Sequence, residues 1–460
     1  MKTTYLKSIP HLILLMLLLL VLLTTDYPIT TDSYAPAVIA IIIAIYLSLF
    51  IFKSAFSPIV FTLIFFLLQP LLGYLNYSYI RTFIPYTDIN FSQPLLIWFV
   101  YVIFFEIGFL VHRSLKKSIP TQLSNPTKII NKNGIEILAF ILIIISIIST
   151  IFFTMRTGGI PFFMGKELDV ARFEWIKLVD SGVIKLISFS VVGTVLLIYL
   201  ILTGKIKCKI GIIVLAIYAL VSSFYFGDRI KLLLIILFGI FCFFKINKKI
   251  KIKYVVFILI LLFLILQIFG FIAYWRGGWA FTSKNIFIRT VQLFTEFWDF
   301  SRAQNTFQPN DIRLRDYNIF YSVYSLIPRQ VLSIFNIDKT RLMSIATFSG
   351  AYSEYYSSRY DLRFSAIGDL YFSFGYYGVF FIFLLGFLYG IINKIFIHMN
   401  IQYPYFNTIS FFIVLLSLLP MLEIKTILDY INVYIFTLFV VEFLTKKSGI
   451  GNLSQSLVKN

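Results

Sequence analysis

Arginine supplies most of the side chains that could hold a charged ligand. The chain contains fourteen arginines, and nine of them fall within residues 275–369, interleaved with Trp, Tyr and Phe. The guanidinium group is planar and permanently charged, so it can grip a phosphate or a carboxylate through two parallel hydrogen bonds. This segment therefore predicts a site for an anionic ligand. Its arginines are Arg276, Arg289, Arg302, Arg313, Arg315, Arg329, Arg341, Arg359 and Arg363.

The triplet Gly227-Asp228-Arg229 predicts a second anion site. It forms the whole connection between two apolar runs, so Asp228 can cap the helix that follows and Arg229 falls in its first turn. A cation at a helix N-terminus opposes the helix dipole, and a bound anion would compensate for this. A capped helix whose Arg229 reaches to the membrane surface is the alternative.

Two further groups of residues have both a functional and a structural interpretation. Arg156 and Arg172, in the connection 155–182, could hold a phosphate or an anionic sugar, or could reach to the membrane surface. Tyr352, Tyr355 and Tyr356 combine an apolar ring face with a hydroxyl, which suits sugar rings. An interfacial aromatic belt is the rival explanation for these tyrosines.

Several kinds of catalytic site do not fit the pattern. The three histidines, His11, His112 and His398, fall near the predicted cytoplasmic face, and no DxD spacing or P-loop occurs in the predicted outer connections. We therefore expect no metal and no cofactor. Catalysis at the outer face would use carboxylates and arginines.

The elements that must position these residues are membrane helices. Charged residues make up 13% of the chain and hydrophobic ones 59%, whereas soluble domains carry about 25% charged residues. The apolar runs are continuous and near twenty residues long, which excludes a β-barrel. A net charge of +19 is scattered between these runs, so it favours membrane lipids and an anionic substrate over nucleic acid.

We predict an all-α, polytopic membrane protein with about twelve transmembrane helices and one large extracytoplasmic loop that contains interfacial helices. Residues 1–274 hold nine helices, residues 275–369 form the loop, and residues 370–460 hold three helices and a short cytoplasmic tail. Lysine-rich connections with almost no acids mark the cytoplasmic face, which places both termini there and thirteen of the fourteen arginines outside. The predicted spans are 9–25, 35–52, 58–76, 94–112, 135–154, 183–203, 210–226, 230–244, 254–274, 370–393, 405–421 and 430–444.

Two details concern single helices. Residues 285–302 have helical spacing with Phe294 and Trp298 on an apolar face and Glu296 and Asp299 on a polar one, which predicts a helix resting on the membrane interface. Glu106 is an acid well inside a span, where acids are usually functional. It also lies seven residues before Arg113, so a structural ion pair is an equal alternative.

These features together resemble the bacterial oligosaccharide repeat-unit polymerases of the Wzy type, which build O-antigen and capsular polysaccharide. The likeness covers most of the chain: about a dozen spans and one dominant late outer loop. It includes the Gly227-Asp228-Arg229 turn, Arg276 just outside a span, the "IPR…K" stretch from Ile327 to Lys339, and the sequence GDLYFSFGYYG at 368–378.

The resemblance implies glycosyl transfer at the outer face of the plasma membrane. An undecaprenyl-pyrophosphate-linked glycan is the donor, a lipid-linked repeat unit is the acceptor, and a chain-length regulator protein is a further candidate partner. The pyrophosphate would be held by Arg229, Arg276, Arg359 and Arg363, and the acceptor hydroxyl would be deprotonated or oriented by Asp228, Glu354 or Asp369.

Three other functions stay open. A lipid-linked oligosaccharide flippase or transporter would suit twelve spans, although it should show two comparable halves and a polar pathway. An O-antigen ligase resembles this architecture too, but such enzymes use an outer histidine that is missing here. A polyprenyl-phosphate-dependent glycosyltransferase would place acids in the first outer connection, where Asp26 and Asp32 lie.

Overall fold

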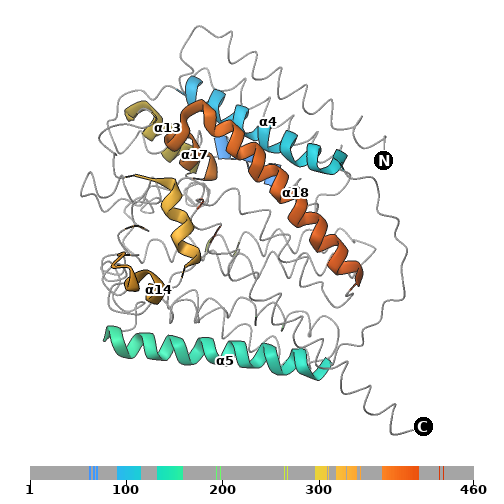
Figure 1. The fold of residues 1–460 in the computed structure, drawn as a ribbon, viewed down its shortest axis with the longest axis vertical. Helices are drawn as coiled ribbons and strands as arrows, with labels where there is room; N and C mark the ends of the chain where they lie inside the picture. Colours follow the sequence, from blue (N-terminus) through green and yellow to red (C-terminus); the bar gives the residue numbers. More distant parts are fainter. Residues whose placement is uncertain are drawn as a thin grey trace. The chain divides into compact units, whose positions relative to one another are not determined.

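The computed structural model describes residues 62–63, 66–67, 69–70, 91–115, 132–158, 193, 197, 264, 267, 296–307, 309, 317–327, 329–338, 342, 365–402, 424 and 428. Every regular element within these residues is helical and none is a strand, which confirms the predicted all-α class for this part of the chain (Figure 1). The elements are α4 (Ser92–Leu115), α5 (Lys132–Thr157), α13 (Glu296–Thr306), η4 (Ile319–Leu326), α14 (Arg329–Ile334), α17 (Ala366–Phe374), η5 (Gly375–Tyr377) and α18 (Gly378–Gln402).

Three described stretches are long and apolar enough to cross a membrane. They are Ser92–His112, Ala139–Thr157 and Ala366–Ile391. The protein is therefore a membrane protein with helical spans. The two predicted spans 94–112 and 135–154 lie within α4 and α5, which extend beyond them at both ends. Most residues of the other predicted spans lie outside the described part.

The chain forms two compact units. The first comprises Met1–Thr121, Thr290–Ile395 and Ile413–Tyr430, and the second comprises Gln122–Arg289, Phe396–Phe412 and Ile431–Asn460. The first unit contains α4, α13, η4, α14, α17, η5 and most of α18, and the second contains α5. The predicted boundaries at 274/275 and 369/370 separate membrane spans from a loop, whereas the two units are separated by contacts within the fold. These boundaries stay a prediction.

In the second unit, α5 has one face that is exposed and apolar. Every third or fourth residue along this face is a large hydrophobic one, as expected of a helix that faces lipid. On its other face, Ser146 and Thr150 are buried, and the Thr150 hydroxyl donates to the Ser146 carbonyl at 2.8 Å. The Thr150 hydroxyl thereby gains a hydrogen-bond acceptor within its own helix, which hydrocarbon could not supply. The exposed residues are Ile137, Ile141, Ile144, Ile148, Ile151 and Met155.

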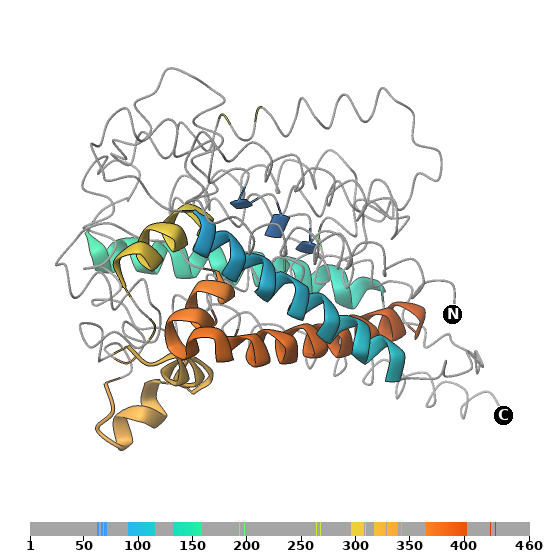
Figure 2. The same cartoon turned by 90° about the horizontal axis from the view of Figure 1, so that it is seen from above.

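In the first unit, α4 and α18 pack side by side through glycine (Figures 1 and 2). A Cβ added to Gly386 of α18 would meet the carbonyl of Phe105, and one added to Gly108 of α4 would meet the carbonyl of Phe383. Backbone thus lies on backbone, which only glycine permits. Near the beginning of α18 Gly378 lies against Tyr101, and further along it Gly390 lies against His112, so α4 and α18 run in the same direction. Two membrane spans that run in one direction require an odd number of crossings between them, and the predicted topology supplies five.

The predicted tenth span, 370–393, largely coincides with the apolar stretch Ala366–Ile391, but it is not a single straight helix. Residues 366–377 form two separate elements, α17 and η5. The chain turns sharply at Gly375, whose φ of 57° is a conformation that glycine adopts without steric cost. The turn is tight enough that a Cβ on Gly378 would lie 2.6 Å from the Leu370 carbonyl. The straight helix therefore begins at Gly378. Hydropathy cannot detect this break because both sides of it are apolar.

The third predicted span, 58–76, has a helical but proline-interrupted described part. Phe66 and Pro70 are both helical, and Pro70 has no N–H to donate to the carbonyl of Phe66. The indole Nε1 of Trp98 on α4 donates to this carbonyl instead, at 2.8 Å. A side chain of one helix thereby replaces the missing backbone donor of another. At the other end of the chain, Ile424 and Leu428 are helical although a connection between spans was predicted there.

Candidate active site around Asp369

Asp369 lies in the first turns of α17 and is fully buried. The helix begins at Ser365, whose hydroxyl accepts a hydrogen bond from the Ile367 backbone N–H at 3.3 Å, and the Asp369 N–H donates to the Ser365 carbonyl. A carboxylate near a helix N-terminus is favoured by the helix dipole. The local sequence Ser-Ala-Ile-Gly-Asp therefore begins a helix and places an acid close to its positive end.

The carboxylate of Asp369 is held from two distant parts of the chain. One oxygen, Oδ2, accepts a hydrogen bond from the backbone N–H of Ile424 at 3.0 Å. The Tyr317 hydroxyl donates to the Asp369 carbonyl at 3.0 Å and lies 3.5 Å from Oδ1. The Ser373 hydroxyl, one turn further along α17, donates to the Tyr317 oxygen at 3.0 Å. The Ile424 N–H is thus the close donor to the carboxylate and offsets part of the cost of burying the acid, while Tyr317 bonds chiefly to the main chain of α17.

A second polar group lies between α4, α13 and α17. Gln304 of α13 donates through Nε2 to Oε1 of Gln93 of α4 at 2.8 Å, and its side chain also hydrogen-bonds to Tyr371 of α17. Phe300 of α13 packs against both Trp98 and Tyr371, with ring centroids 5.8 and 5.6 Å apart. The three helices are therefore joined by one hydrogen-bonded glutamine pair inside an aromatic core.

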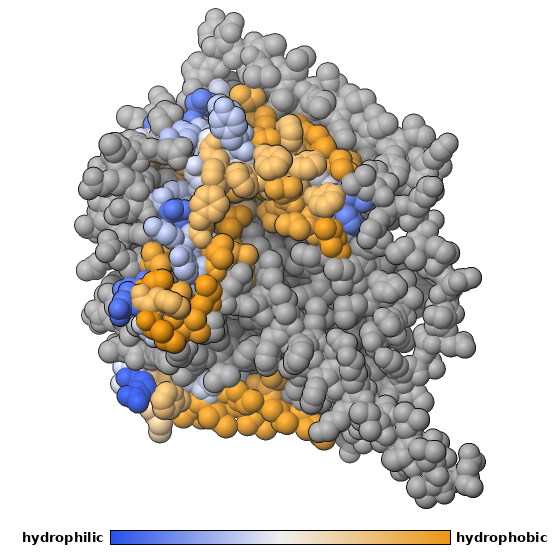
Figure 3. All heavy atoms as spheres, viewed as in Figure 1, coloured by the Kyte–Doolittle hydropathy of each residue, from blue (hydrophilic) through white to orange (hydrophobic). Residues whose placement is uncertain are grey.

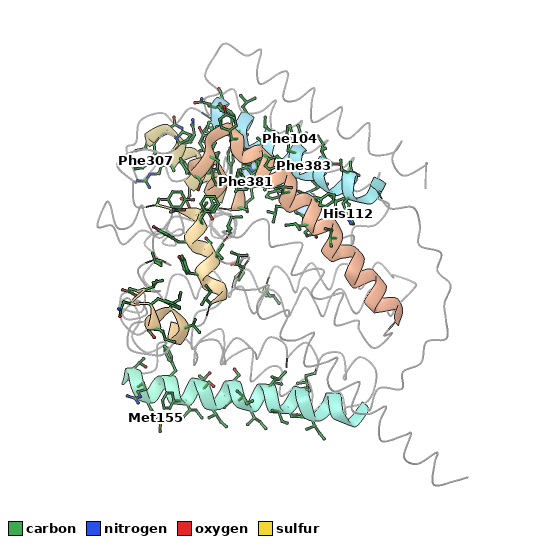
Figure 4. The ribbon with its side chains drawn as sticks, viewed as in Figure 1. Phe104, His112, Met155, Phe307, Phe381 and Phe383 are labelled. Atoms are coloured by element: carbon green, nitrogen blue, oxygen red, sulfur yellow. The ribbon has the colours of Figure 1, made fainter. Side chains whose placement is uncertain are left out.

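The helix α13 differs from its predicted form. It covers Glu296–Thr306, so it runs past the predicted end at 302, and the predicted beginning lies outside the described residues. Phe297 and Phe300 are buried, as is Phe307 just after the helix, and Asp299 is buried rather than solvated; the side chain of Trp298 lies outside the described part. The physical reason is that Phe297 packs edge-on to Trp98 of α4, with ring centroids 5.4 Å apart. Figure 4 labels Phe307 at the end of this helix.

Two predicted site residues fall within the described part. Asp369 is at the centre of the site. Arg156 is in the last turn of α5, in the other unit, with its guanidinium carbon 5.6 Å from the ring centroid of Phe152. This exposed placement stabilises α5 through the helix dipole and the aromatic ring, which supports the structural interpretation of Arg156. The other predicted site residues lie outside the described part: Asp228, Arg229, Arg276, Glu354, Arg359, Arg363, Arg172, Tyr352, Tyr355 and Tyr356.

Two other predictions concern α4. Glu106 is fully buried in this helix, and the side chain of its predicted partner, Arg113, is outside the described part. His112 lies between α4 and α18, where a Cβ on Gly390 would come within 2.6 Å of its Nδ1 (Figure 4). This histidine fills a helix contact. Among the described residues no three His, Cys, Asp or Glu side chains gather as metal ligands.

The site contains residues that the sequence did not reveal. Ser373 follows Asp369 by four residues and so shares its helix face, which is a detectable signal. Tyr317 is 52 residues before Asp369, and Gln93 is 211 residues before Gln304, so only the folded chain brings these together.

The chemistry that this arrangement permits is orientation rather than direct attack. Asp369 has no exposed surface, and its carboxylate already accepts from Ile424. Comparisons of the chain with protein-family models, with curated proteins and with solved structures give no match.

Proposed function

We propose that the protein polymerises undecaprenyl-pyrophosphate-linked repeat units into a surface polysaccharide, O-antigen or capsule, at the outer face of the bacterial plasma membrane. The chain would cross the membrane about twelve times, with both termini in the cytoplasm. The observation that carries the proposal is Asp369, a fully buried acid where the arginine-rich segment meets the membrane helices, tied to that segment by Tyr317. A buried acid is costly, and a functional site is a common reason to keep one.

In this proposal the reaction needs two kinds of group. The bond between the first sugar of the growing glycan and its pyrophosphate breaks, and the acceptor hydroxyl of a fresh repeat unit forms the new glycosidic bond. Arg229, Arg276, Arg359 and Arg363 would stabilise the departing pyrophosphate, because preorganised cations act where charge develops. The proton of the acceptor hydroxyl would pass to an acid, with no metal involved.

We infer a positioning role for Asp369 in this proposal. Its Oδ2 is occupied by Ile424 and its surroundings are closed to solvent, so the proton acceptor is better sought in Asp228 or Glu354. By tying Tyr317 to α17, Asp369 would hold the arginine-rich segment in register with the membrane helices. Correct placement of reacting groups contributes several kcal/mol to catalysis, about 7–11 in favourable cases.

The test is the length distribution of the surface polysaccharide in cells that carry altered copies of the protein. We expect a complete deletion to leave a single repeat unit, and Arg229→Ala or Arg276→Ala to do the same at unchanged protein level. Arg113→Ala, on the predicted cytoplasmic side, is the matched control and should keep the full ladder. A full ladder in the deletion would overturn the proposal. Loss of even the single unit would point instead to translocation or ligation.

A further inference from the structure

The segment 319–335 exposes an unusual number of large apolar side chains for a connection between spans. Ile334 of α14 is 76% exposed, Phe335 is 68% exposed, and Phe320 of η4 is 60% exposed. Val323 and Val331 are exposed as well. We call these five residues, Phe320, Val323, Val331, Ile334 and Phe335, the η4–α14 surface. Figure 3 shows hydrophobic residues over both elements.

The backbone of this segment is well defined rather than frayed. The Asn318 side chain caps η4 by accepting from the Phe320 N–H at 2.9 Å. At the other end, Asn336 has a φ of 55°, and the N–H groups of Ile337 and Asn336 donate to the carbonyls of Leu332 and Ser333. This is the Schellman arrangement, and the Leu332 side chain is buried. The exposed apolar side chains therefore lie on helices whose ends are hydrogen-bonded.

A series of contacts connects η4 to α4 through α17. Phe320 packs against Phe374, with ring centroids 5.7 Å apart, and Phe374 immediately precedes Gly375. The Gly375 carbonyl accepts from the Tyr101 hydroxyl at 2.6 Å. Tyr101 follows Ser92 by nine residues, which is about 13 Å along a helix. Because Ser92–His112 is apolar enough to cross a membrane, the Gly375 turn, beside which Phe320 of η4 packs on Phe374, is bonded to the membrane-spanning part of α4.

The apolar surface also continues onto a helix that faces lipid. Phe374 stacks on Phe381 at 4.3 Å between centroids, and Phe381 packs against Phe380, which is exposed on α18 (Figure 4). Phe320, Phe374, Phe381 and Phe380 thus form an aromatic row from η4 to the exposed side of α18. Tyr376 and Tyr377, which are exposed at the beginning of that helix, are typical of the membrane–water interface.

We propose that the η4–α14 surface is inserted into the hydrocarbon of one leaflet, so that this part of the connection is anchored in the bilayer. An apolar surface of this kind is unfavourable in water, at about 25 cal/mol for each Å² exposed, and lipid removes that cost. Immersed helices must satisfy their own backbone groups, and the caps at both ends do this for part of the segment. The proposal does not depend on the glycosyl-transfer activity.

The test places a fluorescent probe on the surface. Cys208 and Cys242 are first replaced by serine, and single cysteines at Phe320, Ile334 or Phe335 are labelled with an environment-sensitive dye. The full chain is then reconstituted into phosphatidylcholine vesicles that contain lipids with a spin label on the acyl chain. Phe380→Cys is the matched control for lipid contact, and Thr306→Cys, at the exposed end of α13, is the control for water.

We expect the probes at 320, 334 and 335 to show blue-shifted emission and quenching by the spin-labelled lipid comparable to the probe at 380. They should also be protected from iodide, unlike the probe at 306. Quenching by iodide together with insensitivity to the lipid label would overturn the proposal. Protection from both quenchers would overturn it too, because it would mean that protein, from this chain or a second copy, covers the surface.

Discussion

Replacing Trp98 by phenylalanine tests whether its indole N–H stabilises the proline-containing helix by donating to the Phe66 carbonyl. The Phe66 carbonyl loses its helical donor to Pro70, and the Trp98 indole N–H supplies the replacement at 2.8 Å. Phenylalanine keeps a ring among Phe66, Phe297 and Phe300 but has no N–H. The variant therefore leaves a buried carbonyl without a donor.

A second substitution separates the two contributions to the expected loss of folding free energy, the missing hydrogen bond and the cavity. An unsatisfied buried carbonyl costs about 1–3 kcal/mol of folding free energy, and the smaller ring adds a cavity term. Pro70→Ala returns an N–H that can bond to the Phe66 carbonyl within the helix. In the Pro70→Ala background, Trp98→Phe should therefore cost only the cavity term. The difference between the two costs, about 1–3 kcal/mol, measures the hydrogen bond alone.

The assay is thermal unfolding of the purified protein in one detergent, compared across the four members of the cycle. We expect Trp98→Phe to lower the unfolding temperature markedly when residue 70 is proline and only slightly when it is alanine. Equal losses in the two backgrounds would refute the reasoning, because the indole N–H would then contribute nothing specific to the proline-interrupted helix.

Further substitutions test the contacts around α17 and α18. Tyr101→Phe removes the bond that holds the helix break and should cost about 1–2 kcal/mol of folding free energy, measured by thermal unfolding. Gly386→Ala places a Cβ against backbone and should cost about 3 kcal/mol, whereas Gly158→Ala meets no neighbour and should cost only about 1 kcal/mol for its positive φ; similar losses would contradict the backbone contact. Tyr317→Phe removes a donor to the Asp369 main-chain carbonyl, whereas Asp369→Ala leaves the Ile424 backbone N–H without its acceptor, so Tyr317→Phe should lower the unfolding temperature less. Tyr317→Phe should shorten the polysaccharide ladder rather than abolish it.

The sequence predicted the helical class and the location of two spans because a long apolar run has few other solutions in a membrane. It did not predict the reversal at Gly375. The hydropathy of an apolar run does not indicate where the helix axis turns. The Gly375 carbonyl at the turn is bonded to the Tyr101 hydroxyl, which is 274 residues away in the sequence.

The face of α13 could not be read from its sequence for a related reason. The run Phe297-Trp298-Asp299-Phe300 allows two apolar lines on a helix, and periodicity alone does not choose between them. Trp98 accounts for the burial of Phe297 and Phe300, since it offers both rings an aromatic contact. Asp299 is buried as a consequence. A buried acid on a helix that looks amphipathic is therefore a tertiary effect.

The candidate site shows the same division between local and distant causes. Ser365 and Asp369 follow from helix-capping rules and were within reach of sequence reasoning, and Asp369 was predicted as a candidate. Tyr317 and Ile424 were not, because nothing local distinguishes one tyrosine among 29 or one backbone N–H among hundreds. What makes them partners is the short α17, whose single acid is bonded from both sides.

This arrangement gives α17 a mechanical consequence. Its first turns are bonded to Tyr317 and Ile424 through Asp369, and the turn that ends it is bonded to Tyr101 of α4. A nine-residue helix cannot shift without breaking bonds at one end or the other. The segment that carries Tyr317 is therefore linked to α4 through α17 by these hydrogen bonds.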